Sequence, residues 1–182
     1  MFFVFTGPEC TAKTSLSLAL SQQLGMPWQA EIAREYLLRP QKAGAMTDET
    51  TGEYGPDDLL NLVRLQQQAE HNLDAKASRP SVLDTDLLTL IVWWQEKYGA
   101  LPADFSAAWE QMTPRLYLLC EPDIAWQADP LRENPTDRGR LFECYQRELA
   151  RRQCDYSVVS GQGEARVRCA RSIIERALSA LN

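Results

Sequence analysis

Val4-Phe5-Thr6-Gly7-Pro8-Glu9-Cys10-Thr11-Ala12-Lys13-Thr14-Ser15 is the stretch around which the rest of the chain is organised. It follows the apolar run Phe2 to Phe5, which predicts a strand, and its Lys-Thr pair predicts the start of a helix. The pattern G-x-x-x-x-G-K-[ST] is met at every fixed position except the second glycine, which is Ala12. A loop of this form turns successive backbone N–H groups, and the positive end of the helix, toward a phosphate.

The loop predicts a nucleotide-binding segment with defined roles for two side chains. Lys13 is placed to reach the outer phosphates, and the Thr14 hydroxyl is placed to hold Mg²⁺. Ala12 departs from the pattern, because glycine serves such loops where φ is positive or the ligand comes close, and a Cβ there costs on the order of 1 kcal/mol. An ordinary strand–turn–helix with a chance Lys-Thr pair is the alternative. The segment expected to contact the nucleotide is Gly7, Pro8, Glu9, Cys10, Thr11, Ala12, Lys13, Thr14 and Ser15.

Length and composition fit one globular domain over residues 1–182, with a lid segment at about 123–140. The net charge of −6 disfavours a general grip on nucleic acid. The five cysteines are odd in number, scattered and without C-x-x-C spacing, which argues against a disulfide framework and a zinc site and favours reduced thiols in the cytoplasm. No apolar run is long enough for a membrane span.

Strand and helix patterns alternate along the chain, which predicts an α/β fold of three layers with a mostly parallel five-stranded sheet. Expected strands lie at residues 2–5, 27–30, 81–86, 115–120 and 156–159, with helical patterns between them and after the last. Residues 40–56 read as a long surface loop. Ligands of such sheets bind beyond the C-terminal ends of the strands.

Two acids, Asp84 and Asp86, end the apolar strand pattern at residues 81–86, as in a Walker B segment. Two residues apart on a strand, they are expected to point to the same side, one toward Mg²⁺ and the other toward a sugar hydroxyl. The alternative is that either acid caps the following helix.

Arg132 and Arg138 stand in or beside a segment rich in proline, followed by Arg140 and Arg147. Such arginines can close over a nucleotide and neutralise the charge that develops during phosphoryl transfer, and Arg132 and Arg138 are the first candidates. Surface arginines also serve simply to keep a face solvated.

Glu31 lies just past the second expected strand, where a carboxylate can orient or deprotonate a hydroxyl nucleophile. With Arg34 and Glu35 it could equally form a charge pair of little consequence at a helix start. At least three of the five tryptophans are expected to serve packing, and the single histidine, His71, is given no role.

Taken together, these motifs resemble the ribosylnicotinamide kinase domain of bacterial NadR-type proteins and the AAA-labelled ATPase and kinase group around it. The resemblance covers nearly the whole chain and rests on the following segments: residues 7–14, Glu31 to Tyr36, Gln66 with Glu70, Asp84 to Leu88 with Trp93, Glu121 to Trp126, Leu131-Arg132, Arg138, and Val158 to Gly161.

The resemblance implies a P-loop kinase that uses ATP and Mg²⁺ to phosphorylate the 5′-hydroxyl of a nucleoside, with nicotinamide riboside as the family's named substrate. It implies that Lys13 holds the β- and γ-phosphates and that Thr14 and Asp84 serve Mg²⁺. The remaining implied positions are Asp86 and Glu31 near the acceptor sugar, Trp126 near the acceptor ring, Arg132 and Arg138 in the lid, and the Gly161 loop near adenine.

The expected partners are therefore ATP and a small nucleoside-like acceptor, without nucleic acid or membrane. A second hypothesis is a nucleotide-binding or slowly ATP-hydrolysing protein that regulates a partner, its kinase activity eroded at Ala12. The acceptor, the oligomeric state and the choice between Asp84 and Asp86 for the metal stay open at this level.

Overall fold

A computed structural model of the chain describes residues 1–38, 54–76, 79–128 and 135–181. Its strands are β1 (Phe2–Thr6), β2 (Trp28–Gln29), β3 (Ser81–Asp84), β4 (Arg115–Cys120) and β5 (Tyr156–Val159). They form one sheet in the order β2-β3-β1-β4-β5, and every neighbouring pair is parallel. The predicted α/β fold with a parallel five-stranded sheet is confirmed.

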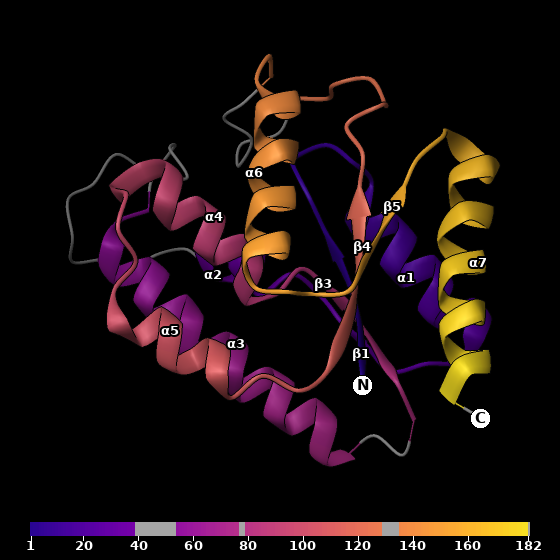
Figure 1. The fold of residues 1–182 in the computed structure, drawn as a ribbon, viewed down its shortest axis with the longest axis horizontal. Coiled ribbons are helices and arrows are strands. Elements are labelled where there is room, and N and C mark those ends of the chain that lie inside the picture. Colours follow the sequence, from indigo (N-terminus) through magenta and orange to yellow (C-terminus); the bar gives the residue numbers. More distant parts are fainter. Residues whose placement is uncertain (39–53, 77–78, 129–134, 182) are drawn as a thin grey trace.

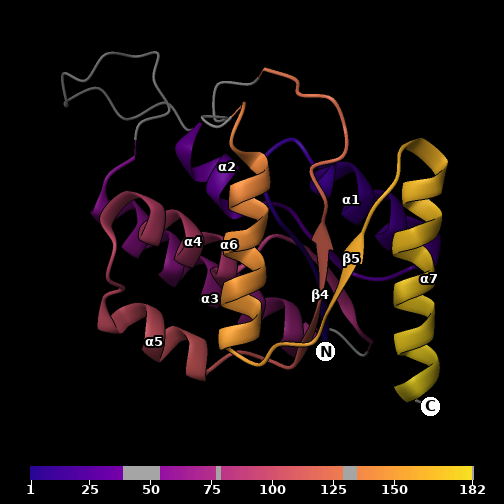
Figure 2. The same cartoon turned by 45° about the horizontal axis from the view of Figure 1, so that its top comes forward.

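Helices cover both faces of this sheet (Figure 1). They are α1 (Lys13–Leu24), α2 (Ile32–Leu37), α3 (Pro56–Lys76), α4 (Leu87–Tyr98), α5 (Ala103–Glu110), α6 (Arg138–Arg151) and α7 (Gly163–Leu181). The pair α1 and α7 lies on one face, and α4 and α6 lie on the other, with α2, α3 and α5 packed beyond them (Figure 2). The short helix α5 was not predicted.

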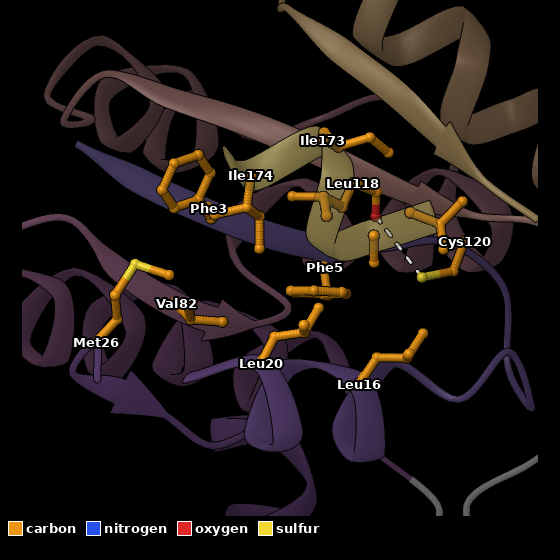
Figure 3. Packing of buried hydrophobic residues seen from close by; sticks show 12 residues of the cluster. Phe3, Phe5, Leu16, Leu20, Met26, Val82, Leu118, Cys120, Ile173 and Ile174 are labelled. Carbon is orange, nitrogen blue, oxygen red and sulfur yellow. Dashed lines mark hydrogen bonds between the residues drawn. The ribbon is translucent and has the colours of Figure 1, made fainter. Parts of the chain in front are cut away.

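The central strand β1 supplies apolar side chains to both layers because alternate residues of a strand face opposite sides. Phe3 and Phe5 pack with Leu16 and Leu20 of α1 and with α7 on one face (Figure 3). On the other face, Phe2 and Val4 pack with residues of α4 and α6. All four are buried, so β1 is fixed from both sides and its C-terminal end presents the following loop at one edge of the sheet.

The structure corrects the predicted end of one strand, and most of one predicted loop falls outside the described ranges. Strand β3 ends at Asp84 and not at Asp86, because Thr85 takes a φ of 65° and breaks the extended backbone. Most of the surface loop expected at residues 40–56 lies outside the described residues. None of the helices in the described ranges combines the length and the apolar character that a bilayer crossing needs.

Candidate active site

The loop between β1 and α1 is a tight turn held by three residues with positive φ. Gly7 has φ 127°, Cys10 has φ 52° and Ala12 has φ 61°. A Cβ on Gly7 would lie 2.7 Å from the carbonyl oxygen of Cys120, so only glycine fits where the loop passes the end of β4. The loop therefore depends on its first glycine for space.

Ala12 occupies the position where the motif carries its second glycine, and it adopts the left-handed conformation with φ 61° and ψ 25°. It precedes the first helical residue of α1 and provides no side-chain cap. This conformation costs an L-residue roughly 1–2 kcal/mol, which glycine would not bear. The replacement of the motif's second glycine by Ala12 therefore strains the backbone, but the turn into α1 still forms.

The polar side chains of the loop fold back onto its own backbone. The Lys13 ammonium donates to the Pro8 carbonyl oxygen at 2.7 Å, and the Thr11 hydroxyl donates to the same oxygen at 2.9 Å. The Ser15 hydroxyl donates to the Ala12 carbonyl oxygen at 3.1 Å. These bonds keep the Lys13 side chain across the loop.

A cavity of about 780 Å³ opens in front of this loop. All nine loop residues from Gly7 to Ser15 line it. Its other walls come from four helices and two loops, and the lining residues there are Leu18, Glu31, Arg34, Leu37, Tyr54, Thr89, Val92, Trp93, Glu96, Lys97, Ile124, Ala125, Gln127, Leu141 and Tyr145. The phosphate loop and Glu31 thus share one cavity, as their places at strand ends predicted.

Asp84, at the end of β3, is buried beside the start of α1. Neither of its carboxylate oxygens has a hydrogen-bond partner among the described residues. Burial raises its pKa, while the nearby Thr14 hydroxyl and the charges of Lys13 and Arg34 lower it in part. A buried carboxylate without a partner is costly unless a cation joins it.

The Asp84 carboxylate and the Thr14 hydroxyl fit a divalent cation that takes only a few of its ligands from protein side chains. No cluster of three or more acidic, histidine or cysteine side chains that could hold a metal occurs in the described ranges. Mg²⁺ suits such a place, because it is commonly held by one or two carboxylates together with substrate phosphates and water.

Asp86 does not stand beside Asp84, and the expectation that the two carboxylates point to the same side is wrong. Asp86 caps α4 by accepting from the Leu88 N–H at 3.0 Å, as the alternative interpretation held. Its other oxygen accepts from Arg115 at 2.7 Å and from the Tyr117 hydroxyl at 2.8 Å. The positive φ of Thr85 turns Asp86 away from Asp84, and Asp86 does not line the cavity, so its expected place near an acceptor sugar is not supported.

Glu31 and Arg34 line the cavity from the start of α2. Glu31 occupies the position before the first helical residue, and its side chain does not cap the helix. The pKa of the Tyr145 hydroxyl is raised, first by burial and also by the charges of Glu31 and Glu9. Acidic groups from the loop and from the start of α2 therefore lie close to Tyr145 in the cavity.

In the lid segment, Arg138 contacts the phosphate loop directly. Its guanidinium donates to the Cys10 carbonyl oxygen at 3.1 Å and to the Ile124 carbonyl oxygen at 3.0 Å. The ring of Trp126 lies under this guanidinium, 5.7 Å from it, and does not line the cavity, so the expected contact with an acceptor ring is not supported. Arg132 lies outside the described residues.

The other two arginines of the expected lid cluster serve the surface. Arg140 pairs with Asp137 and with Glu96, and Arg147 donates to the Cys144 sulfur. The contacts of Arg140 join α6 to α4 and to the residue before its first turn, whereas the contact of Arg147 stays within α6.

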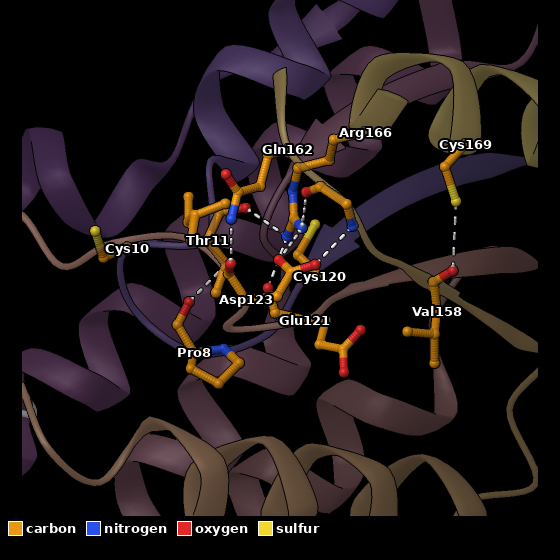
Figure 4. A network of polar contacts seen from close by, with 12 residues as sticks. Pro8, Cys10, Thr11, Cys120, Glu121, Asp123, Val158, Gln162, Arg166 and Cys169 are labelled. Carbon is orange, nitrogen blue, oxygen red and sulfur yellow. Dashed lines mark hydrogen bonds and ion pairs between the residues drawn. The ribbon is translucent and has the colours of Figure 1, made fainter. Parts of the chain in front are cut away.

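Gly161 lies in the loop after β5 and does not line the cavity. Its φ is 91°, and its N–H donates to the Asp123 carboxylate at 2.6 Å. Arg166 also pairs with Asp123. Its guanidinium donates in addition to the backbone carbonyl oxygens of three loops, at Thr11, Glu121 and Gly161 (Figure 4). Sequence reasoning missed Arg166, although its position four residues before Ala170 places it on the buried stripe of α7.

The cavity lining also includes an aromatic pair that sequence reasoning missed. The rings of Tyr54 and Trp93 stack with centroids 5.5 Å apart, and the Lys97 ammonium lies 3.5 Å from the Tyr54 centroid. Three other tryptophans serve packing as expected: Trp28 donates to Ser17, Trp94 donates to the Ala100 carbonyl, and Trp109 lies against Arg152.

The family is clear from a match of the sequence to the family model described as an AAA domain, over residues 2–166. The chain belongs to this AAA-domain family. A search of the curated proteins finds no match.

Solved structures show the same fold as this chain. A NadR protein in complex with NR has a TM-score of 0.73 and 19% identity, over 96% of this chain and 50% of that chain. A NadR protein in complex with NAD and AMP-PNP has a TM-score of 0.69 and 21% identity, over 96% and 48%. The thymidylate kinase of Ehrlichia chaffeensis has a TM-score of 0.64 and 13% identity, over 98% of each chain. The chain spans about half the length of the NadR chains, and the fold is that of P-loop kinases.

Proposed function

We propose that this protein is an ATP- and Mg²⁺-dependent kinase that phosphorylates a hydroxyl of a small nucleoside-like molecule. The observation that carries the proposal is one cavity lined by both the phosphate loop and Glu31, with the buried and unpartnered Asp84 close to Thr14 of that loop. A P-loop kinase needs these three groups to face one another.

Positioning and charge would supply most of the rate in such a site. The loop N–H groups would hold the β- and γ-phosphates, and Lys13, already at the loop, would neutralise the outer one. Thr14 and Asp84 would hold Mg²⁺, whose charge offsets that of the transferred phosphoryl group.

Acceptor activation falls to Glu31, which would orient or deprotonate the attacking hydroxyl. Arg34 in the cavity wall and Arg138 beside the loop would stabilise negative charge during transfer. Arg132 in the lid and the Gly161 loop on the adenine side remain proposals from the sequence.

For the acceptor we propose nicotinamide riboside in NAD metabolism. One similar fold carries NR and another NAD with AMP-PNP. The Trp93 ring supplies an aromatic surface in the cavity, as a planar ring requires. The five cysteines, all free thiols, favour a reducing compartment, and we propose the cytoplasm.

The test is ADP release from Mg·ATP, with and without nicotinamide riboside and a panel of nucleosides. ADP release should depend on one acceptor, and mass spectrometry should find that acceptor phosphorylated. Lys13→Ala should abolish both signals while the protein stays folded. A nucleoside other than nicotinamide riboside as acceptor would revise the substrate and keep the kinase.

A second function has one observation in its favour, the left-handed Ala12 in the loop. If strain there has eroded catalysis, the protein is a slow ATPase or nucleotide sensor that regulates a partner. Hydrolysis that is indifferent to every acceptor would select this function over the kinase.

A further inference from the structure

Arg166, in the first turns of α7, is the largest fully buried side chain of the described residues, with 2% of its surface exposed. It lies at the C-terminal edge of the sheet and outside the cavity. Burying a guanidinium costs free energy unless it is paired and hydrogen-bonded. The contacts of Arg166 therefore indicate what it stabilises.

The guanidinium of Arg166 joins three loops that follow three strands (Figure 4). One terminal nitrogen donates to the Thr11 carbonyl at 3.0 Å and to the Glu121 carbonyl at 2.8 Å. The other donates to the Gly161 carbonyl at 3.1 Å and pairs with Asp123. Asp123 in turn accepts from the Gly161 N–H.

The contact with Thr11 decides how the phosphate loop is oriented. In a trans peptide the C=O and the N–H point in opposite directions. Because the Thr11 carbonyl is drawn toward Arg166, the N–H of Ala12, in the same peptide unit, points away from Arg166. Thr11 and Ala12 both line the cavity, so this orientation presents a donor to a phosphate there.

The same peptide unit leads into the strained residue of the loop. Ala12 has a φ of 61°, which alanine leaves readily and glycine adopts without strain. Without a restraint, the peptide before Ala12 can rotate to relieve this strain and turn its N–H out of the cavity. A fixed donor on the Thr11 carbonyl opposes that rotation.

We propose that Arg166 is a positioning residue that locks the peptide between Thr11 and Ala12, so that the loop keeps its phosphate-binding shape with alanine in place of glycine. This inference rests on the proposed function, because it assigns Arg166 to the same nucleotide site. It predicts a specific coupling: the effect of losing Arg166 depends on which residue stands at position 12.

The experiment compares the wild type with Arg166→Lys, Ala12→Gly and the double variant. A lysine ammonium can keep the charge beside Asp123 but cannot span the same carbonyls. Two quantities are measured: the Kd for Mg·ATP, and hydrogen exchange of the amides of residues 9–13 in nucleotide-free protein. Arg166→Lys should weaken binding by about 10-fold, the equivalent of one hydrogen bond, and speed exchange in the loop.

Ala12→Gly should restore most of the lost affinity and protection in the double variant, since glycine holds the left-handed turn without help. Arg152→Lys is the matched control, because Arg152 is also nearly buried and pairs with Glu148 at the other end of the sheet. It should leave both readings unchanged. Thermal melting reports any general loss of stability, and Arg166→Gln serves if Arg166→Lys does not fold.

Additive effects of the two substitutions, or unchanged loop exchange in Arg166→Lys and Arg166→Gln, would overturn the proposal. A wild type that does not bind Mg·ATP would instead refute the proposed function. In that case hydrogen exchange in the nucleotide-free proteins would still decide whether Arg166 orders the loop.

Discussion

Asp84 and Asp86 stand two residues apart at the end of one strand, and each has 1% of its surface exposed. Asp86 is fully satisfied by the Leu88 N–H, Arg115 and Tyr117. Asp84 has no hydrogen-bond partner among the described residues. A buried carboxylate that is fully hydrogen-bonded within the protein contributes to stability. A buried carboxylate without such partners is available to bind a ligand.

The largest effect should come from Asp86→Ala. It leaves the Arg115 guanidinium buried, with Glu70 as its one remaining carboxylate partner among the described residues, and removes the cap of α4. We expect the free energy of unfolding to fall by about 3–5 kcal/mol. Urea denaturation measures it. A loss below 1 kcal/mol would mean that the Asp86 network is not a stabilising element.

Asp84→Asn should lower the rate of phosphoryl transfer and should not lower the free energy of unfolding. It removes a buried charge that has no partner, so the free energy of unfolding should not fall. Transfer to the acceptor should drop about 10²–10³-fold, the loss typical of removing one group that stabilises developing charge. Steady-state rates and a urea curve on the same sample measure the two effects. Full activity in a folded Asp84→Asn protein would remove Asp84 from the site.

Tyr117→Phe tests the Asp86 network at a single bond. The substitution removes one hydroxyl that donates to a carboxylate and leaves the Arg115 and Leu88 contacts in place. We expect about 1.5–3 kcal/mol of lost stability, the range for hydrogen bonds to charged groups. Calorimetry gives the change, and the Kd for Mg·ATP should stay at the wild-type value. A weakened Kd would mean that the two aspartates are not independent.

The smallest effect concerns pH and Glu70, which shares Arg115 with Asp86. Burial raises the pKa of Glu70 above its ordinary 4.5, and the charge of Asp86 adds to this while Arg115 opposes it. Between 4.5 and that raised pKa, the folded protein keeps a proton that the unfolded chain releases. Stability from this group therefore falls as pH rises through that window and is level above it.

Glu70→Gln provides the comparison for this pH effect. The difference in unfolding free energy, wild type minus Glu70→Gln, should decline from about pH 4.5 upward and then level off. Urea midpoints at half-unit pH steps measure it. A difference that rises over the same range would show that Arg115 dominates the environment of Glu70.

Much of the fold follows from local signals that the sequence carries openly. A continuous apolar run, whose successive side chains face opposite sides, fixes β1 on both faces, and the spacing from Gly7 to Thr14 fixes the loop and the start of α1. Because parallel strands end at one edge, the loop and Glu31 were correctly expected in one place. These inferences need no knowledge of distant contacts.

The remaining parts of the site depend on contacts between distant segments. The turn of Asp86 requires a positive φ at Thr85 and an arginine 29 residues later, and neither is written in the strand pattern. Trp126 pairs with Arg138, which the residues around Trp126 do not indicate. Arg166 could have been found from its place on the buried stripe of α7, where an arginine is out of character.

The central place of β1 in the sheet has a consequence for synthesis of the protein. Its neighbours β3 and β4 lie far later in the chain, and at ribosomal rates even Asp84, the end of β3, is made on the order of ten seconds after Thr6. Throughout that interval the aromatic residues Phe2, Phe3 and Phe5 have no strand to pair with. The nascent chain therefore exposes the apolar segment of β1, which is a natural binding site for chaperones that bind emerging polypeptides.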